Sequence, residues 1–202
     1  IGNLGDITNR AIEVLKSVDI IACEDSRNTQ KLLHHFSIGT KCLSYHKFNE
    51  KERVNQLISL IKSGKKIALV SDAGTPLFCD PGAVIIEELR KEGFAVTSLP
   101  GANAVTTFVS QISRKSDEFV FVGFLPKSDK QILEIFNKYK NTDIVFYESP
   151  KRIVDTLKLI SIEFSERKIS VGRELTKVFE EVLTNTPVDM LNYFSSKDEI
   201  KG

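Results

Sequence analysis

Residues 66–82 read KIALVSDAGTPLFCDPG. The apolar run Ile67–Val70 is typical of a buried β-strand, and a loop with two aspartates, two prolines and two glycines follows it. In an open α/β sheet, ligands bind in the crevice beyond the carboxyl ends of the strands. Asp72 would there offer an anionic acceptor for hydroxyl or amino groups. The pattern predicts a ligand-binding loop, although a rigid connection with helix-capping aspartates explains the same spacing.

Helical and strand-like segments alternate on both sides of this stretch. Apolar residues recur at helical spacing over 11–15 and 57–61, while short β-branched runs occupy 19–22, 67–70 and 95–99. Such alternation is typical of βαβ units that build a parallel sheet. The fold class is therefore predicted to be α/β.

The character of the sequence changes in its second half. We predict an N-terminal α/β sheet domain over residues 1–114 and a C-terminal α+β domain over residues 115–202. The strand-like runs of the second domain, two of them rich in aromatic residues, are 119–122, 144–147, 169–171 and 178–184.

Composition sets broad limits on function. The 202 residues are 41% hydrophobic and 27% charged, with a net charge of +1. A balance this close to neutral gives no overall field that would indicate nucleic acid or a membrane, and it leaves a local basic surface open. Three cysteines without CxxC spacing are expected to be reduced thiols with no metal role. No apolar run is long enough to cross a bilayer and no signal peptide opens the chain, so a cytoplasmic protein is expected.

Two further polar clusters follow predicted strands. Glu24, Asp25 and Arg27 come directly after the run 19–22, and His46 follows the next strand along the chain. Helix capping accounts for Asp25, and a surface or capping role accounts for His46. The density of polar groups at the carboxyl end of a strand favours a site, in which His46 could act as a general base.

Three other segments carry weaker signals. Residues 99–104 read LPGANA, a turn of small side chains that leaves backbone N–H groups open to a ligand. Residues 173–181 read RELTKVFEE, and as a strand they would place charged side chains on both faces, as in a site or a solvated edge strand. The turn GNLGD at 2–6 lacks the GxGxxG spacing, and no GK[ST] motif is present, so neither a Rossmann nor a P-loop nucleotide site is supported.

Eight motifs occur in the order seen in one enzyme family. They are IGNLGD (1–6), EDSRNT (24–29), SYHKFNE (44–50), SDAGTP to DPG (71–82), LPG (99–101), GFLP (123–126), FYESP (146–150) and RELTKVFEE (173–181). On these residues the chain resembles the ribosomal RNA small subunit methyltransferase I family, within the tetrapyrrole-methylase-like superfamily. The likeness covers essentially the whole chain, and it departs from the family pattern at Cys23, Ser26 and Phe48.

The resemblance implies a two-domain tetrapyrrole-methylase-like fold, usually a homodimer, with S-adenosylmethionine in a cleft between the domains. It also implies methyl transfer to the ribose 2′-hydroxyl of a cytidine in 16S rRNA. This displacement needs alignment of acceptor and methyl group, and no metal. The cofactor-binding residues that the resemblance implies are Asp72, Ala73, Gly74, Thr75, Pro100, Gly101, Asn103, Ala104, Tyr147, Leu175 and Thr176.

The proton of the acceptor hydroxyl must pass to a base, and the sequence leaves the choice of base open. Arg27, Lys47 and Arg152 are predicted to contact RNA phosphates, with 16S rRNA in the small ribosomal subunit as partner. The candidate catalytic residues are Glu24, Asp25, His46, Lys177 and Glu180.

Two other functions fit parts of the same pattern. A methyltransferase for tetrapyrroles of the uroporphyrinogen or precorrin type would share the fold, and its polycarboxylate substrate would also favour arginines. A non-catalytic RNA-binding or ribosome-assembly factor would retain the fold without cofactor affinity. The motifs at 24–29 and 146–150 resemble the rRNA family, and the intact loop at 71–82 argues against the non-catalytic factor.

Overall fold

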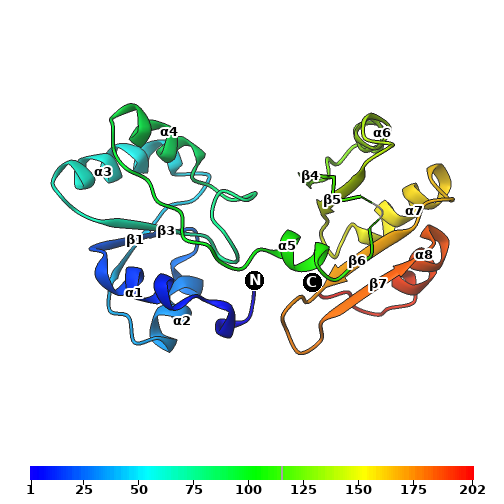
Figure 1. Cartoon of the computed structure of the whole chain (residues 1–202), viewed down its shortest axis with the longest axis horizontal. Helices are drawn as coiled ribbons and strands as arrows, with labels where there is room; N and C mark the ends of the chain where they lie inside the picture. Colours follow the sequence, from blue (N-terminus) through cyan, green and yellow to red (C-terminus); the bar gives the residue numbers. More distant parts are fainter. Residues whose placement is uncertain (115) are drawn as a thin grey trace. The chain divides into compact units, whose positions relative to one another are not determined.

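The structure is a computed structural model that describes residues 1–114 and 116–202. The chain divides into two units, Ile1–Asn103 and Ala104–Gly202, and each has its own fold (Figure 1). The sequence-based boundary at 114/115 lies later, beyond helix α5 (Ala104–Val109), and Lys115 is outside the described residues. That boundary stays a prediction. No helix within the described ranges is long and apolar enough to span a membrane.

Three parallel strands form the sheet of the first unit, in the order β2-β1-β3. They are β1 (Ile20–Cys23), β2 (Lys41–Ser44) and β3 (Ile67–Val70). The helices are η1 (Leu4–Asp6, a 3₁₀ turn), α1 (Asn9–Ser17), α2 (Ser26–His35), α3 (Glu50–Lys62) and α4 (Ala83–Lys91). The predicted α/β fold class is confirmed.

The central strand β1 is covered on both faces. Successive side chains of a strand point to opposite faces, so Ala22 packs toward α3 and α4 while Ile21 and Cys23 pack toward α1 and α2. Figure 1 shows the two helix pairs on opposite sides of the sheet. Burial on both faces is typical of a parallel sheet, and it leaves only the strand ends open to a ligand.

The prediction of a strand at 95–99 is wrong. No strand is assigned there, although Val96 and its neighbour Phe94 are partly buried against the α3–α4 core. The apolar residues of this segment therefore serve packing against helices instead of strand pairing. The chain leaves α4 at Gly93, whose φ of +80° is a backbone conformation that glycine adopts without strain.

The second unit has two small sheets. β4 (Phe119–Phe124) pairs in parallel with β5 (Asp143–Tyr147), and β6 (Ile169–Arg173) pairs antiparallel with β7 (Glu181–Asn185). Its helices, besides α5, are α6 (Asp129–Lys138), α7 (Ile153–Glu163) and α8 (Pro187–Ser195). Apolar residues of α7 hold this unit together, because Ile160 packs with α6 and Leu157 packs with α8.

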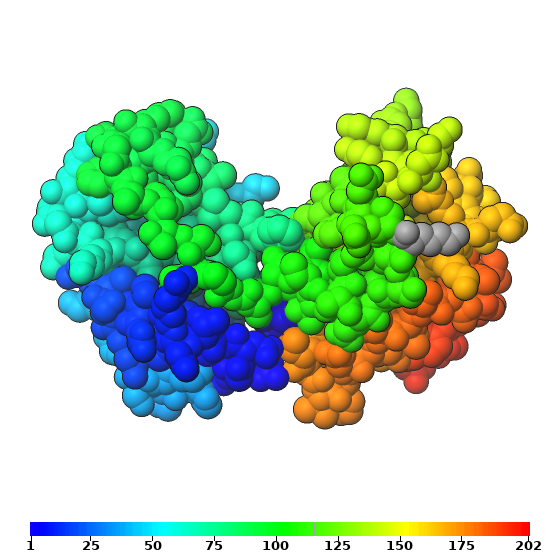
Figure 2. All heavy atoms as spheres, viewed as in Figure 1, coloured from blue at the N-terminus to red at the C-terminus, as the bar shows by residue number. Residues whose placement is uncertain are grey.

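The segment between β6 and β7 differs from the expectation. The alternation of faces predicted for 173–181 is wrong, because residues 174–180 form a turn and β7 begins only at Glu181. Glu174 and Thr176 adopt positive φ angles of 51° and 67°, which interrupt extended backbone. Figure 2 shows this loop, in orange, standing out from the second unit.

Candidate active site at the carboxyl ends of the parallel strands

Asp72 joins two of the predicted polar clusters. Its Oδ1 accepts a hydrogen bond from the backbone N–H of Asp25 at 3.0 Å, and its Oδ2 accepts one from the side-chain amide of Asn28 at 3.3 Å. The contact arises because β1 and β3 are neighbours in a parallel sheet, so the residues that follow both strands meet at one edge. The structure therefore brings together the loops at 24–29 and 71–82.

Asp25 caps helix α2, as one of the two readings of the sequence expected. Its Oδ1 accepts from the backbone N–H of Arg27 at 2.9 Å, and its Oδ2 lies 2.7 Å from Nη2 of the same arginine. These hydrogen bonds with Arg27 lower the pKa of Asp25 to about 2. A carboxylate that holds a proton so weakly is a poor base near neutral pH.

Glu24 has the opposite electrostatic environment. Burial raises the pKa of its carboxyl group, and the facing carboxylates Asp72 and Asp80 raise it further. Burial also raises the pKa of Asp80, and the negative charge of Asp72 raises the pKa of Asp80 further. We call Glu24, Asp72 and Asp80 the acidic cluster.

No group of three or more His, Cys, Asp or Glu side chains in the described ranges is arranged to hold a metal ion.

The raised pKa of Glu24 makes a prediction about stability. A carboxyl with a raised folded-state pKa stabilises the fold while it is protonated, and this contribution is lost as the pH rises through the folded pKa. Glu24→Gln is therefore expected to increase the free energy of unfolding at pH 7. The gain should shrink as the pH falls through the raised folded-state pKa and vanish below about 4, the ordinary glutamate pKa. Thermal unfolding at several pH values measures it.

The control for Glu24→Gln is Glu13→Gln, which alters an exposed carboxylate on α1. This control should leave the unfolding temperature unchanged at every pH. An equal effect of Glu24→Gln at pH 7 and at pH 4 would show that the substitution acts through packing and not through charge.

Glu50 links the end of β2 to the loop that follows β3. Its Oε1 accepts from the hydroxyl of Tyr45 at 2.6 Å and from the backbone N–H of Gly82 at 3.0 Å. Tyr45 is fully buried, so its hydroxyl depends on this partner. Sequence reasoning did not single out Glu50 or Tyr45, although both lie in the motif at 44–50. The signal would have been a tyrosine directly after a strand and an acidic residue five positions later, at the start of the next helix.

His46 opens a tight turn after β2. Its backbone N–H donates to Oδ1 of Asn49 at 2.8 Å, and the Asn49 amide donates to the carbonyl of Ser44 at 3.2 Å. The imidazole Nδ1 is buried without a hydrogen-bond partner among the described residues. The backbone N–H of Tyr45 donates to the carbonyl of Cys23 at 2.7 Å, so His46 follows β2 at the same edge of the sheet as Glu24.

The predicted cofactor residues of the first unit form two adjoining loops. Thr75 Oγ1 donates to the carbonyl of Ala102 at 3.3 Å, which joins the loop at 71–82 to the one at 99–103. Gly74 has a φ of +79°, and a Cβ placed there would lie 3.6 Å from the same carbonyl. A Cβ at Gly101 would meet no atom within 4 Å, so the backbone there is open to a ligand. The structure thus brings Gly74 and Thr75 next to Ala102, which lies between the predicted residues Gly101 and Asn103, and the cofactor role of both loops stays a prediction.

The remaining predicted cofactor residues belong to the second unit. Ala104 begins α5, and Leu175 and Thr176 lie in the loop between β6 and β7. Tyr147 ends β5, where its ring contacts Phe121 and Phe124 at centroid distances of 5.0 and 5.3 Å. Their role in cofactor binding stays a prediction.

The charged candidates of the second unit are engaged in local contacts. Lys177 Nζ lies 2.8 Å from the Glu174 carboxylate, and Glu180 accepts from the backbone N–H of Thr176. Arg152 donates to the carbonyls of Leu125 at 3.0 Å and Pro126 at 2.6 Å. These bonds give Arg152 a structural role, and its proposed contact with RNA phosphate stays a prediction.

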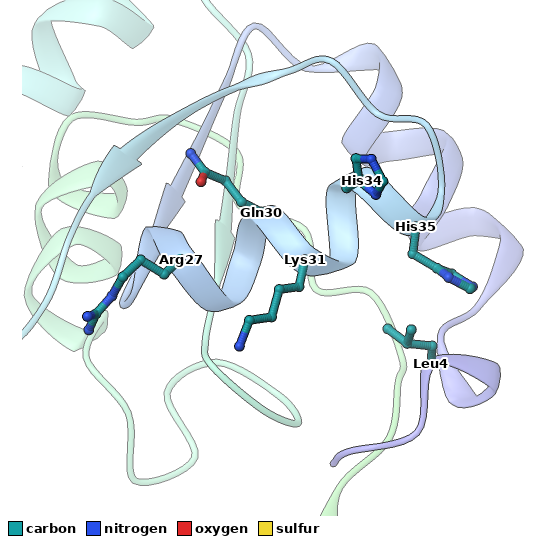
Figure 3. A pocket seen from close by; sticks show the side chains of 6 residues that line it. All are labelled: Leu4, Arg27, Gln30, Lys31, His34 and His35. Carbon is teal, nitrogen blue, oxygen red and sulfur yellow. The ribbon is translucent and has the colours of Figure 1, made fainter.

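A shallow groove of about 520 Å³ runs along α2. Figure 3 shows its side chains spread along the helix from Arg27 to His35, with Leu4 of η1 beside the second half of α2. No ion pair in the described part of the chain involves Lys31, His34 or His35. The lining side chains include no carboxylate and are Leu4, Arg27, Gln30, Lys31, His34 and His35.

Residues 1–190 match the family described as Tetrapyrrole (Corrin/Porphyrin) Methylases. The whole chain is also 44% identical, over 204 residues, to ribosomal RNA small subunit methyltransferase I of Halalkalibacterium halodurans, and it covers 70% of that protein. The chain belongs to the ribosomal RNA small subunit methyltransferase I branch of the tetrapyrrole methylases. The resemblance predicted from the eight motifs is confirmed.

Other relatives of this methylase carry the same name. The enzyme of Bacillus subtilis is 44% identical and matches all of this chain and 70% of its own length. The Thermotoga maritima enzyme is 39% identical, with 98% of this chain and 89% of its own length covered. The methylase therefore corresponds to most of the length of these relatives.

Solved structures share the fold of this methylase at low sequence identity. A diphthine synthase superposes with a TM-score of 0.74 at 15% identity, covering 99% of this chain and 82% of its own. A uroporphyrin-III C-methyl transferase from Thermus thermophilus, complexed with S-adenyl homocysteine, gives 0.63 at 15% identity, with 98% and 88% covered. At such identities the likeness shows the fold alone.

Proposed function

We propose that this methylase transfers a methyl group from S-adenosylmethionine to the ribose 2′-hydroxyl of a cytidine in 16S rRNA. The relatives named ribosomal RNA small subunit methyltransferase I, at about two-fifths identity over nearly the whole chain, support an rRNA substrate. The observation that carries the proposal is the junction of the polar loops 24–29 and 71–82 through Asp72. We further propose that the protein acts as a homodimer in the cytoplasm, on rRNA within the small subunit.

The loops after β3 and α4 suit S-adenosylmethionine. Asp72 offers a carboxylate to hydroxyl or amino groups, and a Cβ at Gly101 would meet no atom within 4 Å, so the backbone there is open to a ligand. Bound there, the cofactor would supply a methyl group on a sulfonium, whose C–S bond breaks as the ribose oxygen attacks the methyl carbon in line and S-adenosylhomocysteine leaves. The proposed cofactor residues are Asp72, Ala73, Gly74, Thr75, Pro100, Gly101 and Asn103, with Ala104, Tyr147, Leu175 and Thr176 from the second unit.

Glu24 is the proton acceptor that the electrostatics of the site favour. Its raised pKa makes it a stronger base than Asp25, whose pKa of about 2 reflects its bonds to Arg27. In this assignment Glu24 Oε takes the proton as the ribose oxygen forms its bond to the methyl carbon. His46 shares this edge of the sheet and is the second choice, and Lys177 and Glu180 of the second unit remain candidates.

The groove along α2 suits the RNA backbone. From Arg27 to His35 the helix rises about 12 Å, a length that spans three to four phosphates of a stacked strand. Substituting both Arg27 and Lys31 with alanine is expected to weaken binding to small subunits about 10-fold and to flatten its salt dependence, because two phosphate contacts are lost. Filter binding at several salt concentrations measures both quantities.

The matched control for the groove is Lys130→Ala, which removes an exposed lysine on α6. It should retain the affinity and the salt dependence of the wild type, and both proteins should bind S-adenosylmethionine normally. A double variant that binds subunits as tightly as wild type would remove the groove from the RNA path.

The test of the function uses radiolabelled S-adenosylmethionine and small subunits that lack the modification. We expect label on the 2′-oxygen of a single cytidine after nuclease digestion and mass mapping. Label on a base would overturn the ribose chemistry. Label on a uroporphyrinogen or precorrin, with none on the subunit, would favour a tetrapyrrole methyltransferase. A protein that binds subunits without cofactor affinity would be an assembly factor.

A further inference from the structure

Phe48 is a large apolar side chain that the fold leaves almost wholly in water. Its exposure is 95%, the highest among the large hydrophobic side chains of the described residues. Its described ring contact is an edge-on one with His46, at a centroid distance of 6.1 Å and an interplanar angle of 64°. The side chain of Phe48 belongs to neither core cluster of the first unit, so the fold gains no apolar burial from it.

A closed turn holds Phe48 in this position. Besides the two side-chain bonds of Asn49, the Asn49 backbone N–H donates to the His46 carbonyl at 3.0 Å. Asn49 is also the residue before α3, so one end of the turn is fixed to a helix. Phe48 therefore sits on a preorganised support, and a ligand that contacts the ring need not order a flexible loop.

The surroundings of Phe48 favour a nucleic acid. The turn follows β2 at the same edge of the sheet as the acidic cluster. The residue before His46, Tyr45, donates its backbone N–H at 2.7 Å to the carbonyl of Cys23, the residue before the proposed proton acceptor Glu24. Exposed Lys47 lies next to Phe48 in the chain. An exposed aromatic ring beside a cation is the combination with which proteins hold single-stranded nucleic acid, since the ring stacks on a base and the cation binds a phosphate.

We propose that Phe48 is a stacking platform for a nucleobase of the RNA, next to the nucleotide whose ribose is methylated. The inference rests on the proposed rRNA substrate and adds a positioning residue to that site. Stacking on Phe48 holds the strand in register, so that one ribose and not its neighbours reaches Glu24. Lys47 binds the phosphate next to the stacked base.

The test compares Phe48→Ala, Phe48→Leu and Phe48→Trp. Because the side chain is exposed, none of the three should change the unfolding temperature, and each should bind S-adenosylmethionine like wild type. We expect kcat/KM for small subunits to fall about 5- to 100-fold in Phe48→Ala and in Phe48→Leu. Phe48→Trp should retain it, since tryptophan offers a stacking face. Mass mapping should show methylation spread to neighbouring nucleotides in the alanine variant.

Ile162→Ala is the control, because Ile162 is 68% exposed on α7 and has no place in the proposed site. Wild-type kcat/KM in Phe48→Ala would overturn the proposal. So would a tryptophan variant as slow as the alanine variant, or a change of oligomeric state in size-exclusion chromatography, which would mark Phe48 as a protein contact. If the wild type itself fails to methylate small subunits, the proposed function fails, which is a separate result.

Discussion

Asp72→Asn is expected to weaken S-adenosylmethionine binding about 10- to 100-fold while raising the unfolding temperature. The lost affinity corresponds to a charge-assisted hydrogen bond of about 1.5–3 kcal/mol between the carboxylate and the cofactor. The gain in stability arises because the negative charge of Asp72 repels the carboxylates of Glu24 and Asp80, which is why it raises the pKa of both. The asparagine removes this repulsion from the folded state. An asparagine can still accept the backbone N–H of Asp25 through its Oδ1, which keeps that bond of the junction, while its amide nitrogen cannot accept from Asn28.

Calorimetric titration with S-adenosylmethionine and thermal unfolding at pH 7 measure the two effects. Asp80→Asn is the matched control, since it removes the second negative charge that faces Glu24 without touching Asp72. It should raise the unfolding temperature and leave cofactor affinity near that of wild type. If Asp72→Asn binds the cofactor as tightly as wild type, Asp72 is a structural cap and not a ligand.

The α/β fold that the sequence predicted brings the polar loops 24–29 and 71–82 to one edge of the sheet. Once β1 and β3 are recognised as neighbours, the residues after them must meet, and Asp72 does contact the loop at 24–29. Adjacent residues can nevertheless differ in their electrostatic environment. Asp25 turns to the N–H groups of α2 while Glu24 is partly buried, and such orientations depend on tertiary packing.

The errors have a common physical cause. The runs 95–99 and 178–184 both have the apolar and β-branched residues of a strand. The first packs on α3 and α4 without a strand partner, and the second loses its first residues to a turn with positive φ at Glu174 and Thr176. Strand propensity describes a surface that suits pairing, and it carries no information about whether a partner is available.

Glu50→Ala is expected to lower the free energy of unfolding by about 2–5 kcal/mol, a large part of the stability of an ordinary domain. The substitution leaves two donors without a partner, the hydroxyl of fully buried Tyr45 and the backbone N–H of Gly82. It also removes the tie that holds the end of the loop 71–82, so cofactor affinity should fall as well. Urea unfolding gives the first quantity and calorimetric titration the second.

Two comparisons separate the lost hydrogen bonds from a general effect of shortening a side chain on α3. Glu52→Ala removes an exposed carboxylate two residues further along the helix and should change the free energy of unfolding by less than about 0.5 kcal/mol. Combining Tyr45→Phe with Glu50→Ala should restore part of the loss, because the variant no longer buries a hydroxyl without an acceptor. If the double variant is less stable than Glu50→Ala alone, the hydroxyl has another acceptor and the link between β2 and the loop does not depend on Glu50.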